Sequence, residues 1–181
     1  MQQLVTDLLA EFQRDARGRK AAQRLAQYSA SADDWRGYAH FHADAYTRNL
    51  VARNEHFEML VLCWSAGQES PIHDHAGQHC WMAILDGHIE ETQFRVPEVP
   101  GALVEGPSRT FERGQVAYIH DDIGLHRVRP AAGASAVSLH LYSRPIDVCK
   151  VFDRATGRVL EKTLLYHSVE GRALGGAPHA R

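Results

Sequence analysis

Two histidines separated by one residue, His73 and His75, have a spacing that is typical of metal binding. Residues two apart in a β-strand point to the same face, so both imidazoles can converge on one ion while Asp74 points away. The pair alone is weak evidence, because a solvated loop after Pro71 could carry the same residues. The segment therefore predicts a metal site only if other residues of the chain support it.

A second segment, SLHLY at residues 138–142, alternates polar and apolar side chains. Strand alternation places Ser138, His140 and Tyr142 on one face. Each of these three side chains can donate and accept a hydrogen bond, so together they could form a relay. The solvent face of a half-buried strand would also suit these residues, and the pattern leaves both interpretations open.

Arg48, two residues after Tyr46, is the third candidate. Its planar guanidinium could hold a carboxylate through two parallel hydrogen bonds. Without further context, an ordinary surface arginine is the better explanation of the residue.

The elements that must position these side chains fall into two parts. Leu4, Leu8, Leu9 and Phe12 lie on one face at helical spacing, and residues 1–44 are expected to form a helical N-terminal segment. From residue 45 to 168 the chain is rich in short strands, and residues 169–181 are expected to be a tail. Many short strands bounded by turn residues favour a sandwich or a closed β-barrel in a single domain.

Asp86-Gly87 separates two of the expected strands, residues 79–85 and 89–96. This dipeptide tolerates positive φ, so the two strands are expected to form a hairpin with a type I′ turn. The prolines and glycines between residues 97 and 107 predict a surface loop.

The composition excludes several classes of protein. The formal net charge of −2 gives no reason to expect nucleic acid or an anionic membrane as a partner. No apolar stretch reaches the length of a membrane span, and the first residues lack the apolar core of a signal peptide, so a cytoplasmic protein is expected. A monomer is also expected. Three cysteines without a CxxC pair argue against a disulfide framework and against a thiolate zinc site.

Residues 67–87 resemble the first motif of the cupin family, with the spacing G-x5-HxH-x4-C-x6-G. Cys80 stands where cupins usually carry a glutamate ligand, which leaves a site of nitrogen donors only. The second cupin motif supplies one more histidine, and His126 in Gly124-Leu125-His126 is the candidate, although its surroundings match more loosely. The resemblance implies a mainly β fold, a small jelly-roll-like cupin barrel that follows the N-terminal helical segment.

Six segments together resemble cysteine dioxygenase, in the order of that family and over about two thirds of the chain. These segments are YTRNLV (46–51), LCW (62–64), HDHAGQHCWMAILDG (73–87), YIHDDIGLHRV (118–128), SLHLYS (138–143) and FDRATG (152–157). Their joint occurrence is far more specific than the two histidines alone.

The resemblance implies a role for each candidate residue. His73, His75 and His126 would bind ferrous iron, and Arg48, helped by Tyr46, would hold the carboxylate of cysteine. The substrates would be a small thiol and O2. A coordinated thiol loses its proton, and cysteine could chelate the ion through sulfur and amine. Both oxygen atoms would end on sulfur, which gives cysteine sulfinic acid.

The resemblance also implies that Ser138, His140 and Tyr142 form the relay and that Cys80 becomes joined to Tyr142 by a thioether bond. One departure affects this region. The family carries Ser-Pro-Pro after the tyrosine, with a cis bond before the first proline, whereas this chain has Ser143-Arg144-Pro145. A non-proline cis bond costs about 3 kcal/mol, so the positioning of Tyr142 is the open point.

Three other functions stay open at this point. A 3-mercaptopropionate dioxygenase would be similar, but such enzymes characteristically carry glutamine where this chain has Arg48. A zinc hydrolase or cupin isomerase could use the same three histidines and would differ in its metal. A cupin that senses a thiol or a metal would need neither Arg48 nor the relay.

Overall fold

The computed structural model describes residues 1–99 and 101–175. Within them, the N-terminal part is helical and the rest is mainly β. The helices are α1 (Gln2–Arg14), α2 (Ala21–Ser31) and the short 3-10 helix η1 (Asp34–Tyr38). The strands are β1 (Thr47–Arg53), β2 (Glu58–Trp64), β3 (Ile72–His73), β4 (Cys80–Asp86), β5 (His88–Arg95), β6 (Val104–Glu112), β7 (Val116–Ile119), β8 (Leu125–Pro130), β9 (Ala136–Tyr142), β10 (Val148–Phe152), β11 (Val159–Thr163), β12 (Ser168–Val169) and β13 (Arg172–Ala173).

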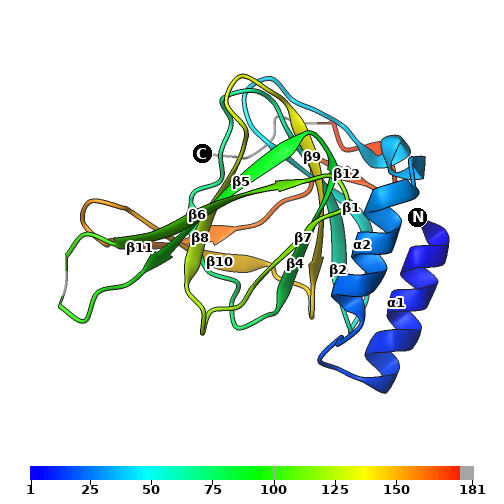
Figure 1. Cartoon of the computed structure of the whole chain (residues 1–181), viewed down its shortest axis with the longest axis horizontal. Helices are drawn as coiled ribbons and strands as arrows, with labels where there is room; N and C mark the ends of the chain where they lie inside the picture. Colours follow the sequence, from blue (N-terminus) through cyan, green and yellow to red (C-terminus); the bar gives the residue numbers. More distant parts are fainter. Residues whose placement is uncertain (100, 176–181) are drawn as a thin grey trace.

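The strands form two sheets that pack face to face. One sheet has the order β13-β12-β1-β2-β9-β4-β7, and the other has the order β11-β10-β3-β8-β5-β6. Figure 1 shows α1 and α2 covering the outer face of the first sheet, while the second sheet lies on the side away from the helices. The expected mainly β barrel with an N-terminal helical segment is confirmed. None of the helices described is long and apolar enough to cross a membrane.

The central strands of the first sheet are buried on both faces, and β9 shows why. Its odd-numbered residues, such as Leu139, pack against Leu8 of α1 and Leu25 of α2 in one hydrophobic cluster. Its even-numbered residues face the second sheet, where Tyr142 belongs to a separate cluster inside the barrel. The alternating sequence of β9 therefore supplies an apolar face to the helices and a polar face to the barrel interior.

The prediction of a hairpin at Asp86-Gly87 is wrong. β4 pairs with β9 and β7, whereas β5 pairs with β8 and β6, so the dipeptide leads from one sheet into the other. A type I′ turn needs positive φ at both central residues, but only Gly87 has it, with a φ of 69°. A Cβ on Gly87 would lie 2.6 Å from the carbonyl oxygen of Ser135, so this corner also needs a residue without a side chain.

Two further expectations about the chain are corrected. The supposed surface loop contains β6, which pairs with β5 at the edge of its sheet and is exposed along most of its length. Pro107 fits there because an edge strand can leave one side of its backbone unpaired. The tail does not begin at residue 169, because β12 pairs in parallel with β1 and β13 pairs with β12. Residues 176–181 of the expected tail lie outside the described residues.

Candidate metal centre and substrate pocket

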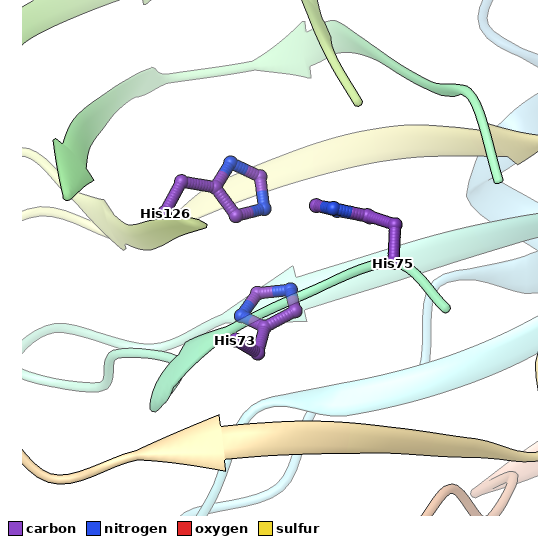
Figure 2. Close-up of side chains that lie close together, drawn as sticks. All are labelled: His73, His75 and His126. Carbon is purple, nitrogen blue, oxygen red and sulfur yellow. The ribbon is translucent and has the colours of Figure 1, made fainter. Parts of the chain in front are cut away.

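Three histidines from separate parts of the sequence meet inside the barrel. His73 ends β3, and its Cα partner across the sheet is His126 on β8. Only His73 is in the strand, because His75 lies two residues beyond the end of β3. The two side chains nevertheless converge. One ring nitrogen from each residue lies within 4.8 Å of the others. Figure 2 shows the three rings turned toward a common centre.

Hydrogen bonds on the far side of two rings set their orientation. Nδ1 of His73 donates to the carbonyl oxygen of Pro71 at 2.9 Å. Nδ1 of His126 donates to Oε1 of Glu91 at 2.6 Å, and both residues are buried. A bond of this kind fixes the tautomer, so Nε2 of each ring is left as the lone-pair donor that faces the centre.

Asp121 holds the backbone around His75. Its carboxylate accepts hydrogen bonds from the amide of His75 at 2.7 Å and from the amide of Gly77 at 2.6 Å. Burial opposes ionisation of this carboxyl, but the hydrogen bonds outweigh it and lower the pKa of Asp121 to about 2. The ionised side chain thus stabilises a tight turn in which Ala76 and Gly77 both have positive φ.

The cluster has the properties that a divalent metal requires. Both ring nitrogens of His75 and Nε2 of His126 are buried without a hydrogen-bond partner, and buried polar atoms in this state are costly unless something binds them. Burial lowers the pKa of His73 to about 3, so its ring is neutral, as a ligand must be. The described cluster contains histidines only. Three imidazole nitrogens suit a first-row transition metal such as ferrous iron.

A hydrogen-bonded chain runs along the inner face of β9. The indole Nε1 of Trp64 donates to Oγ of Ser138 at 2.9 Å, and Oγ lies 3.0 Å from Nε2 of His140. The Tyr142 hydroxyl lies 3.4 Å from Nδ1 of His140. The expected relay is therefore in contact and buried. The alternative of a solvent-facing strand is wrong, because all seven residues of β9 are buried.

Arg48 and Tyr46 lie in the same pocket as the histidines. His73, His75, His140 and Tyr142 line this pocket too. Only 9% of Arg48 is exposed, which rules out an ordinary surface arginine. The Tyr46 ring stacks on Trp64 at 4.5 Å between centroids. The structure therefore brings a cation, a phenol and the histidine cluster together around one small space.

Cys80 and Tyr142 are directly opposite each other on neighbouring strands β4 and β9. Both are buried. Just beyond the pair, the amide of Ser143 donates to the carbonyl oxygen of His79, and the amide of His79 donates to Oγ of Ser143, each at 3.0 Å. No cis peptide bond occurs in residues 1–99 and 101–175, so the bond after Ser143 is trans.

Three acidic residues near the pocket were not singled out from the sequence. Glu91 and Asp121 support the histidines, and Glu58 is completely buried beside Arg48. The only sequence signal was for Glu91, which lies two residues after Ile89 and so shares its inward face. Asp121 is in a turn and Glu58 begins a strand, where no periodicity distinguishes them.

The fold and the histidine cluster define a cupin-type β-barrel protein with a candidate metal centre. A solved structure of a conserved Klebsiella pneumoniae protein with a double-stranded β-helix domain is similar to it, with a TM-score of 0.52. That alignment covers 72% of this chain and 95% of the other at 12% identity, so it supports the fold alone.

The family model described as cysteine dioxygenase type I matches residues 1–155. Cysteine dioxygenase type 1 of Rattus norvegicus and that of Homo sapiens are each 42% identical over 150 residues, which cover 81% of this chain and 75% of the relative. The Danio rerio protein of that name is 39% identical over 163 residues, 87% of this chain and 81% of its own length. This chain belongs to the cysteine dioxygenase type I family. The membership confirms the expected family and the expected enzyme class, an oxidoreductase.

Proposed function

We propose that this protein oxidises L-cysteine with O2 to cysteine sulfinic acid, using ferrous iron held by His73, His75 and His126. The observation that carries the proposal is the buried cluster of three histidines with Arg48 in the same pocket. Family membership supports both the reaction and the substrate.

Ferrous iron, when bound, supplies a centre at which the thiolate of cysteine and O2 can react. The protein's own contribution begins with substrate orientation. Nε and Nη2 of Arg48 are buried and have no hydrogen-bond partner. A carboxylate that enters the pocket can satisfy these donors, which gives Arg48 its role in binding the carboxylate end of cysteine.

Trp64 gives the relay its direction. An indole N–H can only donate, so Oγ of Ser138 accepts from Trp64 and its own proton is available for Nε2 of His140. Nδ1 of His140 then carries the proton and donates toward the oxygen of Tyr142. Burial raises the pKa of Tyr142 well above its ordinary value, so the phenol keeps its proton. The hydroxyl of Tyr142 is therefore the free donor of the chain, available to orient the substrate.

The cross-strand position of Cys80 and Tyr142 supports the proposed thioether. Joining Sγ of Cys80 to the ring carbon next to the phenol oxygen breaks one S–H and one C–H bond. Two electrons and two protons leave the pair, and O2, a substrate of the proposed reaction, accepts them. The alternative, in which Cys80 only fills space in the barrel wall, predicts no thioether.

Intact mass and a denaturing gel test the cross-link in protein that has turned over cysteine with iron and O2. A cross-linked fraction is expected to be lighter by two hydrogens and to migrate faster. Both signs should be absent in Cys80→Ser. Cys63→Ser, which replaces another buried cysteine, is the matched control and should still show the lighter mass and the faster migration. An unmodified mass after many turnovers would leave the space-filling role for Cys80.

The proposed reaction is tested with protein loaded with iron in the absence of O2 and then given L-cysteine and O2. Cysteine sulfinic acid should form. His75→Ala should lose bound iron and turnover together. His88→Ala, which removes an exposed histidine far from the cluster, should lose neither. Full iron content in His75→Ala would refute the metal assignment.

The same assay separates the other functions. Arg48 would pair with the carboxylate of any small thiol acid, so 3-mercaptopropionate is the comparison substrate, and its turnover is expected to be slower. Zinc in place of iron, with hydrolytic activity, would favour the hydrolase. The proposal includes a cytoplasmic location, supported by three cysteines that are free and buried. The expected monomer stays a prediction, which size-exclusion chromatography can check.

A further inference from the structure

Beside Arg48, and not among the residues that line the pocket, lies a completely buried carboxylate, Glu58. It is the first residue of β2. Its Cα partners are Arg53 on β1 and Tyr142 on β9, so it sits between a second arginine and the relay tyrosine. A buried charge is stable only when neighbouring groups compensate it. The groups around each of its two oxygens therefore indicate what Glu58 does.

The first oxygen, Oε1, is held firmly. The Tyr166 hydroxyl donates a hydrogen bond to it, and Nη1 of Arg53 lies 3.4 Å away. Nη1 of Arg53 also donates to the Tyr166 oxygen at 2.6 Å. Asp147 in turn fixes the guanidinium of Arg53, whose Nη1 and Nη2 donate to the two carboxylate oxygens of Asp147 at 2.8 and 2.9 Å. Burial, and next the hydrogen bond to Glu58, raise the pKa of Tyr166 to about 12, so this phenol stays a donor.

The second oxygen, Oε2, is not held in this way. It lies 3.6 Å from Nη2 of Arg48, which is longer than a hydrogen bond, and no described residue donates to it. Nη2 and Nε of Arg48 likewise have no partner. Glu58 therefore gives Arg48 a nearby counter-charge but leaves Nε and Nη2 of the guanidinium without an acceptor.

We propose that Tyr166 and Arg53 hold Glu58 back from Arg48, so that the guanidinium donors stay open for the carboxylate of the substrate. Glu58, Tyr166 and Arg53 are thus positioning residues that act through Arg48. The inference rests on the proposed function in one respect, that Arg48 binds the substrate carboxylate.

The physical basis is a competition between two carboxylates for one guanidinium. If Glu58 lost its anchor, its side chain could rotate toward Arg48 and form a close, charge-assisted pair. That pair would be intramolecular and buried, and the substrate would have to displace it. Removing the restraint should weaken cysteine binding, and removing the negative charge of Glu58 as well should restore it.

The test is binding of L-cysteine to the iron-loaded protein without O2, measured by calorimetry. Tyr166→Phe removes the donor to Glu58 and should raise the Kd about tenfold. The double variant Tyr166→Phe/Glu58→Gln should return to within about twofold of the wild type. Tyr38→Phe removes a phenol hydroxyl near α1 and serves as the matched control. Arg53→Gln is an independent way to loosen Glu58 and should also raise the Kd.

Cysteamine, which keeps the thiol and the amine of cysteine but lacks the carboxylate, separates this effect from general damage. Its Kd should be the same in wild type and Tyr166→Phe, and iron content should be unchanged. In turnover, Tyr166→Phe should raise KM for cysteine and leave kcat within about twofold.

Two outcomes would overturn the inference. One is a double variant that binds cysteine as weakly as Tyr166→Phe alone, and the other is an equal loss of cysteine and cysteamine binding. If wild type and variants bind cysteine in the expected order but the wild-type protein forms no sulfinate, the proposed function is refuted and the inference stands.

Discussion

Glu91 offers the sharpest single test of how this chain would hold the proposed iron. Its Oε1 accepts the hydrogen bond of Nδ1 of His126 at 2.6 Å, and only 3% of the residue is exposed. The bond fixes the His126 tautomer and makes Nε2 a stronger donor. We therefore expect substitution of Glu91 to weaken iron binding without removing any ligand.

Two substitutions of Glu91 should weaken iron binding to different extents. Glu91→Gln keeps a carbonyl oxygen that can accept from Nδ1, so it removes the charge and little else. Glu91→Ala also leaves Nδ1 of His126 buried without an acceptor. Loss of such a partner lowers metal affinity by about 10–100-fold. Glu91→Gln should lower iron affinity by about tenfold and Glu91→Ala by about a hundredfold. At 1.36 kcal/mol for each factor of ten, these losses correspond to about 1.4 and 2.7 kcal/mol of binding free energy.

The assay is a titration of iron-loaded protein with a competing chelator in the absence of O2. Glu90→Gln is the matched control, because Glu90 is the adjacent residue on β5 and instead binds Arg129 at 2.6 Å. Its iron affinity should equal that of the wild type. If Glu91→Ala retained wild-type affinity, or if Glu90→Gln lost as much, the hydrogen bond to His126 would not contribute to metal binding.

Three further substitutions test the pocket and the fold. Arg48→Ala should raise KM for cysteine and lower kcat/KM about tenfold to a thousandfold, with iron retained; unchanged kinetics would place the carboxylate elsewhere. Leu139→Ala removes a completely buried side chain between β9 and the helices and should cost about 2–5 kcal/mol in chemical denaturation; a loss below 1 kcal/mol would contradict tight packing there. Gly87→Ala should lower the melting temperature more than Gly133→Ala, because both have positive φ but only Gly87 would place a Cβ against backbone; equal losses would mean that the corner can relax.

The sequence predicted the histidine cluster because strong local patterns mark it. His73 and His75 are two residues apart, and the motif around them is specific enough to bring in His126 from a distant segment. Alternation in β9 places Ser138 and His140 on one face, and the resemblance to cysteine dioxygenase then favoured a relay over a solvent-facing strand. The spacing of His73 and His75 and the alternation of β9 are short-range patterns, which are present in the sequence whatever the strands pair with, whereas His126 and the relay followed from the resemblance.

The parts that were wrong or missed depend on long-range partners. Asp86-Gly87 has the composition of a hairpin turn, but the strand before it is buried on both faces and takes β9 and β7 as neighbours. Glu58 is the first residue of β2, and its burial beside Arg48 arises only when β1, β2 and β9 come together. A charged residue gives no local signal of the counter-charge that makes its burial possible.

The two-sided burial of β9 also limits how this strand can change during evolution. Its inner face carries the proposed relay and its outer face packs on the helices. Because successive side chains point to opposite faces, inserting or deleting one residue within the strand would send leucines into the pocket and polar groups under the helices. Point substitutions alter one face at a time, whereas such a length change alters both at once. We therefore expect natural length variation to gather in exposed loops such as residues 131–135, and the length of β9 to be nearly invariant.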